Sequence, residues 1–166
     1  MPTYRYSFQN YNPIVHVRAS AREINVSPKA AREVCKSISG KKLTDALTFL
    51  EDVIDLKKPV HFRRHKKEVA HRTSTEKFHA GKFPVKTAQY ISNLINEVES
   101  NADFKGLDTK NIRIIHAAAH RARKIPGYKP RAQGRSTPFI HELVHVEIVA
   151  GWLISWFHKV IWYKKF

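Results

Sequence analysis

The chain is poor in cysteine and in long apolar stretches. Only Cys35 is a cysteine among the 166 residues, so no disulfide can form within the chain, and we expect a reducing, cytoplasmic location. The N-terminus lacks the apolar core of a secretory signal. The longest apolar stretch, Trp152 to Tyr163, contains His158 and Lys159 and falls short of the roughly 20 residues that a membrane helix needs. We therefore expect no membrane insertion.

Recognisable catalytic and cofactor-binding motifs are also scarce. The sequence contains no P-loop, no G-x-S-x-G nucleophile motif and no glycine-rich dinucleotide fingerprint. We therefore predict neither a cofactor nor an enzymatic activity. The exception is His141-Glu142-Leu143-Val144-His145, which matches the H-E-x-x-H pattern of zinc peptidases.

That pattern binds zinc on a helix, because a helix brings both histidines to one face. On a strand, His141 and His145 would lie roughly 13 Å apart, too far to hold one ion. No acidic residue follows Glu147 to serve as a downstream ligand. The neighbouring residues favour a strand: Phe139, Ile140, Val144, Val146, Ile148 and Val149. We predict a strand without a metal, and a zinc metallopeptidase is the alternative.

Acidic residues are outnumbered about two to one. The 30 Lys and Arg residues against 14 Asp and Glu give a formal net charge of +16 and a pI of about 10.1. Such a charge is typical of nucleic-acid-binding proteins. A basic protein that binds an anionic membrane surface is the competing interpretation.

The positive charge is concentrated in two segments. The first, residues 121–138, has the sequence RARKIPGYKPRAQGRSTP and contains no acidic residue. Its prolines and glycines exclude a regular helix, and strand-like segments flank it. We predict a hairpin over about 110–149 whose tip, 121–138, leaves the globular body. The candidate contacts in this hairpin are Arg121, Arg123, Lys124, Tyr128, Lys129, Arg131 and Arg135.

The second basic segment, residues 61–83, reads HFRRHKKEVAHRTSTEKFHAGKF. A charge run by itself is usually only a solvated surface. Two such segments in one strongly positive chain are explained more simply by a shared polyanionic partner. The candidate contacts in this insertion are Arg63, Arg64, Lys66, Lys67 and Arg72.

The remaining sequence predicts an α+β fold. Alternating apolar residues indicate a first strand around Val15 to Ala19. Helices are predicted after Ser27, after Thr44 and after Pro84, because apolar residues then recur at helical spacing. We expect about three helices packed on a three-stranded antiparallel sheet, with the long hairpin protruding. Residues 1–150 would form a single domain.

Both ends of the chain are rich in aromatic residues. The N-terminal set consists of Tyr4, Tyr6, Phe8 and Tyr11. These side chains could stack on unpaired RNA bases or pack on the domain's own surface, and the sequence leaves both open. The C-terminal extension, 151–166, leaves little polar face, so we expect it to dock on a partner rather than stand free in water.

Several of these segments together resemble one known family. The run ASAREINVSPKAAREVCKSISGKKLTDALTFL, residues 19–50, is similar to the first half of ribosomal large-subunit protein twenty-two in its archaeal and eukaryotic form. The segment PRAQGRS, residues 130–136, resembles the P-R-A-x-G-R signature of that family's hairpin. The helix expected over 85–103, ending in Ser100-Asn101-Ala102, also matches.

The resemblance implies a structural protein of the large ribosomal subunit that binds several domains of its ribosomal RNA and assists assembly. The hairpin would line the nascent-peptide exit tunnel and its tip would meet the nascent peptide. Neighbouring large-subunit proteins would be further partners. The same resemblance implies RNA contacts of the body at Lys29 and Arg32 and in the 61–83 insertion.

Overall fold

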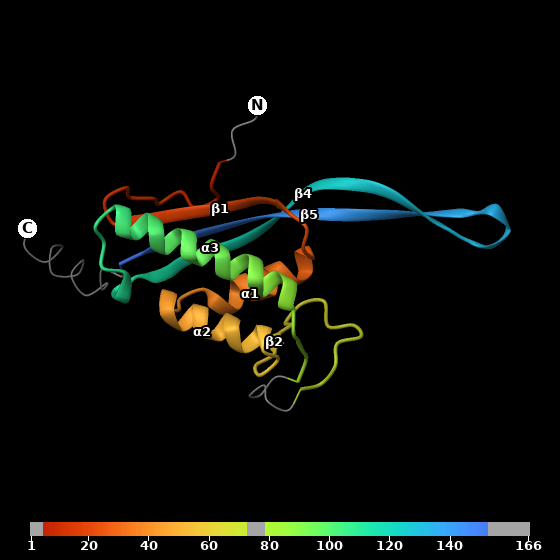
Figure 1. Ribbon diagram of the computed structural model, residues 1–166, viewed down its shortest axis with the longest axis horizontal. Helices are drawn as coiled ribbons and strands as arrows, with labels where there is room; N and C mark the ends of the chain where they lie inside the picture. Colours follow the sequence, from red (N-terminus) through yellow and green to blue (C-terminus); the bar gives the residue numbers. More distant parts are fainter. Residues whose placement is uncertain (1–4, 73–78, 153–166) are drawn as a thin grey trace, which may run out of the picture.

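The fold is an α+β arrangement with a long two-stranded arm (Figure 1). The computed structural model describes residues 5–72 and 79–152. Its three helices are α1 (Pro28–Ile38), α2 (Leu43–Ile54) and α3 (Val85–Phe104). Its strands are β1 (His16–Ile24), β2 (Val60–His61), β3 (Gly81–Lys82), β4 (Arg113–Pro130) and β5 (Ser136–Gly151).

The main sheet is antiparallel, with the strand order β1-β5-β4. All three helices cover one face of it (Figure 1). Along β5, Val144, Val146 and Ile148 are completely buried, and they join a core with apolar residues of every helix. The predicted three helices and three-stranded antiparallel sheet are therefore confirmed.

Local sequence explains where the helices begin and end. Ser27 precedes α1 and Pro28 occupies its first turn, where the missing N–H of proline costs no hydrogen bond. Gly40 follows the end of α1 with a φ of +84°, a left-handed conformation that glycine adopts without strain. The second helix starts one residue before the predicted cap, because Lys42 rather than Thr44 occupies the N-cap position.

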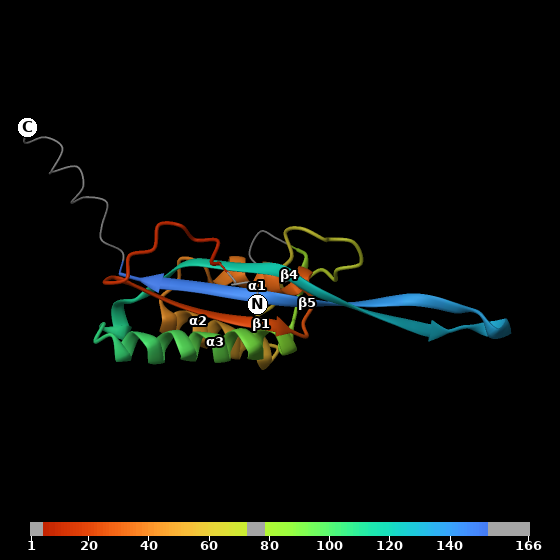
Figure 2. The same cartoon turned by 90° about the horizontal axis from the view of Figure 1, so that it is seen from above.

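The hairpin keeps its strands for longer than the sequence suggested. We expected the tip of the hairpin to span residues 121–138, but β4 runs to Pro130 and β5 starts at Ser136. The turn contains only residues 131–135, including a short 3-10 helix. Beyond the body the two strands have no further neighbours in the sheet, so proline is tolerated there as it is on any edge strand. Figures 1 and 2 both show this arm projecting well beyond the helices.

Two irregularities in the β4–β5 pairing change which residues share a face of the sheet. One lies between Ile114 and His116, and the other between Arg121 and Lys124. Strict alternation along this strand would put Ala118 on the same face as Ile114, but the first irregularity places Ala118 opposite Glu147, on the sheet face away from the helices. Ile140 has the same spacing along β5 as the core residues Val144, Val146 and Ile148, but it is 54% exposed because it belongs to the projecting arm.

Parts of three sequence predictions lie outside the described residues. These are the centre of the basic insertion and nearly all of the aromatic C-terminal extension, as well as Tyr4. In the part of the chain that the structure describes, no helix combines the length and apolar character required to cross a bilayer.

Candidate nucleic-acid interface

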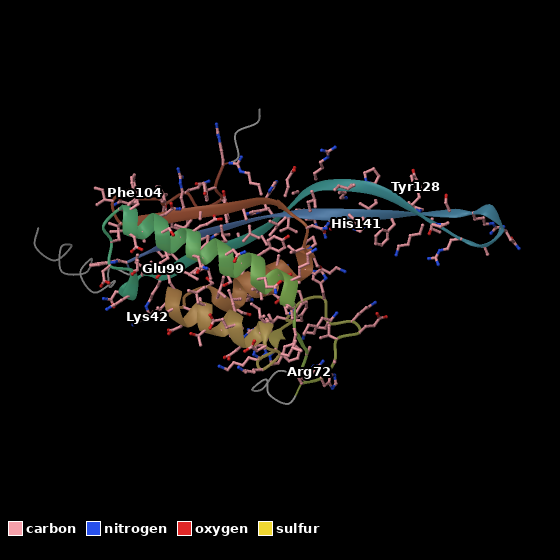
Figure 3. The ribbon with its side chains drawn as sticks, viewed as in Figure 1. Lys42, Arg72, Glu99, Phe104, Tyr128 and His141 are labelled. Carbon is pink, nitrogen blue, oxygen red and sulfur yellow. The ribbon has the colours of Figure 1, made fainter. Side chains whose placement is uncertain are left out.

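The projecting arm carries most of the predicted hairpin contacts on an exposed surface. Between residues 121 and 141 the arm holds six Lys and Arg residues and no acidic residue. Every residue from 128 to 141 is exposed. Because the arm has no core of its own and lies outside the body, it presents its cations to whatever surrounds it (Figure 3).

Glu142 marks the inner limit of this cationic surface. Its carboxylate lies 3.6 Å from the Nε of Arg121 and 4.0 Å from the Nζ of Lys124. Both cationic side chains are about three-fifths exposed, so these ion pairs contribute little to stability. Arg121 and Lys124 therefore remain able to meet a phosphate.

The turn at the tip is compact. The N–H of Arg131 donates to the carbonyl of Arg135 at 2.8 Å, and the Nε of Arg131 donates to the hydroxyl of Thr137 at 3.3 Å. Gln133 and Gly134 take left-handed conformations with φ of 58° and 67°. The turn thus brings two arginines together at the far end of the arm.

Aromatic side chains lie among the cations of the arm. Tyr128 is 74% exposed (Figure 3). Across the hairpin, the Nζ of Lys129 lies 3.8 Å from the centroid of the Phe139 ring, and the ring of His141 meets Phe139 edge-on at 4.5 Å. We did not foresee Phe139 and His141 as interface residues. The available signal was that Phe139 and His141 occupy alternate positions of the strand that directly follows the basic tip.

A buried carboxylate on α1 holds the start of the basic insertion. Glu33 is 1% exposed and accepts hydrogen bonds from the backbone N–H groups of Arg63 and Arg64, both at 3.3 Å. It also pairs with the guanidinium of Arg32 at 2.6 Å. The backbone at Arg63 and Arg64 is therefore held in place, while their side chains remain exposed. The guanidinium of Arg32 is already paired with Glu33.

The rest of the described insertion is anchored through apolar residues and short backbone bonds. Phe62 and Val69 are buried in the core. The N–H of Arg72 donates to the carbonyl of His79 at 2.7 Å, and its guanidinium lies 5.2 Å from the centroid of the Phe83 ring. The insertion lies at the end of the body from which the arm emerges (Figures 1 and 2). The two predicted basic surfaces thus flank one end of the body.

The N-terminal segment packs on the sheet face that the helices leave open. Arg18 of β1 lies with its guanidinium carbon 4.7 Å from the ring centroid of Tyr6 and 4.5 Å from that of Tyr11. Phe8 contacts the rings of His16 and His116. Of the two interpretations left open for the N-terminal aromatics, packing on the domain's own surface is the one observed for Tyr6, Phe8 and Tyr11.

The anchor of this segment is Glu147, a fully buried carboxylate that sequence reasoning missed. Both of its oxygens accept the N–H of Ser7 at 3.1 Å, and the Ser7 hydroxyl also donates to it. The Nε2 atoms of His116 and His120 lie 3.0 and 3.4 Å away. Burial would raise the pKa of Glu147, but the hydrogen bonds from Ser7 and His116 outweigh it and lower that pKa below its ordinary value.

The chain matches a known protein family over most of its length. A family model described as "Ribosomal protein L22p/L17e" matches residues 19–151. The chain belongs to this family. Its members are structural proteins of the ribosome rather than enzymes.

Archaeal relatives agree over most of the chain. The "Large ribosomal subunit protein uL22" of Archaeoglobus fulgidus is 42% identical over 150 residues, which are 90% of this chain and 97% of the relative. The protein of the same name from Methanocaldococcus jannaschii is 45% identical over 145 residues, 87% of this chain and 92% of the relative. That from Cenarchaeum symbiosum is 45% identical over 150 residues, 90% of this chain and 98% of the relative. The resemblance found in the sequence, to the archaeal form of the family, is confirmed.

The H-E-x-x-H pattern lies on β5 and not on a helix. His145 uses its Nδ1 to accept the N–H of Glu23 at 3.1 Å, while His141 packs edge-on against Phe139. Within residues 5–72 and 79–152, no three His, Cys, Asp or Glu side chains are arranged to hold a metal ion. The metallopeptidase alternative is wrong, because the strand separates the two histidines and the family is structural.

Proposed function

We propose that the protein is built into the large ribosomal subunit in the cytoplasm, with its arm inserted between segments of large-subunit ribosomal RNA. The observation that carries this proposal is the arm itself: six cations and no acidic residue over 121–141, on two strands that the body cannot bury. An arm of this composition requires an anionic surrounding. The membership of the family and the names of its relatives supply the ribosomal setting.

The arm acts by neutralising charge between RNA helices. Phosphates repel one another when two helices approach, and cations between them offset this repulsion. Contacts to phosphate fix position without reading sequence, so recognition depends on the shape of the folded RNA. Exposed Tyr128 and Phe139 stack on unpaired bases in this proposal.

The body supplies a second group of RNA contacts. These are Lys29, Arg32 and the insertion residues Arg63, Arg64, Lys66, Lys67 and Arg72. Because arm and insertion flank one end of the body, they can hold separate RNA segments at a fixed distance. A protein that joins several RNA segments in this way would favour early assembly of the subunit.

The tip of the arm forms part of the wall of the nascent-peptide exit tunnel in this proposal, where it meets the nascent peptide. The compact turn at 131–135 suits such a position, since it is narrow and fully exposed. Neighbouring large-subunit proteins would contact the remaining surface of the body.

The experiment compares two double variants that remove the same charge. Arg131→Ala/Arg135→Ala changes the tip, whereas Lys42→Ala/Lys110→Ala changes the body. Figure 3 shows Lys42 at the end of the body opposite the arm, and Lys110 belongs to the short helix Thr109–Asn111 that contacts α2. Affinity of the full chain for large-subunit RNA is measured over a series of salt concentrations. We expect the tip variant to lower the salt slope by about 2, one for each lost phosphate contact, and to delay subunit assembly.

An equal loss of affinity for large-subunit RNA in both variants would contradict a specific role of the arm. A parallel measurement with anionic vesicles separates the membrane-surface alternative: vesicles should be displaced by large-subunit RNA. Vesicle binding that resists the RNA would overturn the proposal.

A further inference from the structure

A pocket of 520 Å³ lies where the start of α1 meets the basic insertion. Its wall is formed by three separate stretches of chain: the first turn of α1, the insertion from Phe62 to Glu68, and the end of β3 with the residues after it. The volume falls within the range of about 300 to 1,000 Å³ that is usual for small-molecule sites. Three distant parts of the sequence thus line one pocket.

The polar part of the wall is cationic. Lys29, Lys67 and Lys82 all line the pocket, and Glu68 is the acidic residue among the lining residues. All three lysines are exposed, so their ammonium groups can reach a ligand without a large desolvation cost. The pocket also opens beside the first turn of α1, which contains no acidic residue and so leaves its partial positive charge uncompensated. This composition favours an anion.

The remaining wall is apolar and partly aromatic. Phe62, Phe83 and Pro84 line it together with Ala30. Phe83 is half-buried and therefore has its position fixed by the surrounding fold. A phosphate alone would not use such a wall, whereas a flat base attached to a phosphate would.

The backbone of the insertion is unusual at the pocket. His65 and Glu68 both line it, and both adopt left-handed conformations, with φ of 56° and 57°. Such conformations are unfavourable for residues other than glycine and concentrate at functional sites. The loop therefore accepts local strain in order to shape this wall.

We propose that the pocket binds one unpaired nucleotide of the ribosomal RNA, with its phosphate between Lys29, Lys67 and Lys82 and its base against Phe83. This inference rests on the proposed function and deepens it, because it assigns the insertion a nucleotide-binding site beyond a general attraction for phosphate. Recognition of an unpaired nucleotide requires a local RNA shape, and so it contributes to placing the body on the correct segment.

The test uses the full chain bound to large-subunit RNA and measures the 2′-hydroxyl reactivity of every nucleotide. Two variants change the pocket: Lys29→Ala/Lys67→Ala removes cations, and Phe83→Leu replaces the aromatic ring by an apolar side chain. Lys42→Ala/Lys110→Ala is the charge-matched control. We expect one unpaired nucleotide that wild type and control protect, whose protection falls about fivefold or more in both pocket variants. Protection of RNA by the arm should remain.

The failures of the two proposals are distinguishable. If no nucleotide loses protection in both pocket variants while the arm still protects RNA, the pocket assignment is overturned and the proposed function stands. If wild type protects no large-subunit RNA, the proposed function itself fails. Titration with adenosine monophosphate alone gives a further check, since saturation at micromolar concentration would assign the pocket to free nucleotides and overturn the RNA assignment.

Discussion

Replacing Glu147 by glutamine should weaken the attachment of the N-terminal segment to the sheet. Glu147 is fully buried. The N–H of Ser7 donates to its carboxylate, and the Nε2 of His116 lies within hydrogen-bonding distance of it. Glutamine has nearly the same shape, so the variant removes the charge without opening a cavity. It also places an NH2 group where a carboxylate oxygen accepted hydrogen bonds, which leaves donors facing a donor.

The size of the effect follows from the bonds at one oxygen. The Oε1 atom accepts the Ser7 hydroxyl and N–H and lies 3.0 Å from the Nε2 of His116. A hydrogen bond to a charged group contributes about 1.5–3 kcal/mol, and some of this is recovered by the remaining oxygen of the amide. We therefore expect Glu147→Gln to lower the free energy of unfolding by about 2–4 kcal/mol. The melting temperature should fall by about 5–15 °C for a chain of this size.

Denaturant unfolding followed by circular dichroism measures the difference in the free energy of unfolding between wild type and Glu147→Gln. The pH dependence of this difference shows whether the charge of Glu147 causes it. The pKa of Glu147 is lowered below 4.5 in the folded protein, so its charge stabilises the fold above about pH 4.5. This stabilisation is lost as the pH falls through the folded-state pKa. The difference in the free energy of unfolding between wild type and Glu147→Gln should therefore narrow as the pH falls below about 4.5.

Ser7→Ala serves as the partner in a double-mutant cycle, and the two substitutions should be coupled by about 0.5–3 kcal/mol because the residues touch. The account of the buried carboxylate would be refuted if Glu147→Gln lowered the free energy of unfolding by less than about 0.5 kcal/mol. A difference from wild type that does not change at low pH would refute it as well.

Two further predictions concern α1. Burial raises the pKa of the Cys35 thiol to about 12, so it should resist alkylation at pH 8 in the native protein and react only after unfolding; rapid native labelling would contradict its buried position. Glu33→Gln should expose residues 61–72 to proteolysis well before the sheet unfolds, because the bonds to the N–H groups of Arg63 and Arg64 lose their charged acceptor. Equal protection of that segment in the variant and in wild type would show that Glu33 does not hold it.

The helices and the first strand could be predicted because their apolar residues repeat with a clear period. Ile91, Ile95 and Val98 follow one face of α3 and are all buried. The arm could be predicted in outline, since a basic stretch with prolines lies between two β-favouring segments. The ends of its strands could not be predicted. Local rules treat Pro126 and Pro130 as strand breakers, but β4 is an edge strand, which accepts proline.

The candidate site could be predicted in composition but not in arrangement. Lys29 and Lys67 stand far apart in the sequence, and only the fold brings them to one pocket. Glu147 was missed for a similar reason. A single acidic residue in an apolar strand indicates a solvent-exposed position, and its burial depends on Ser7, which lies 140 residues earlier.

The central claim is that the tip of the arm lies inside the large subunit, surrounded by ribosomal RNA. Ala132→Cys places an exposed thiol in the turn, while buried Cys35 stays unreactive, so a tethered hydroxyl-radical source can be attached at the tip alone. In assembled subunits carrying this variant we expect strong cleavage of large-subunit RNA on several strands close together in the folded RNA. Cleavage that is absent, or no stronger than that from a source at exposed Lys110→Cys, would contradict the claim.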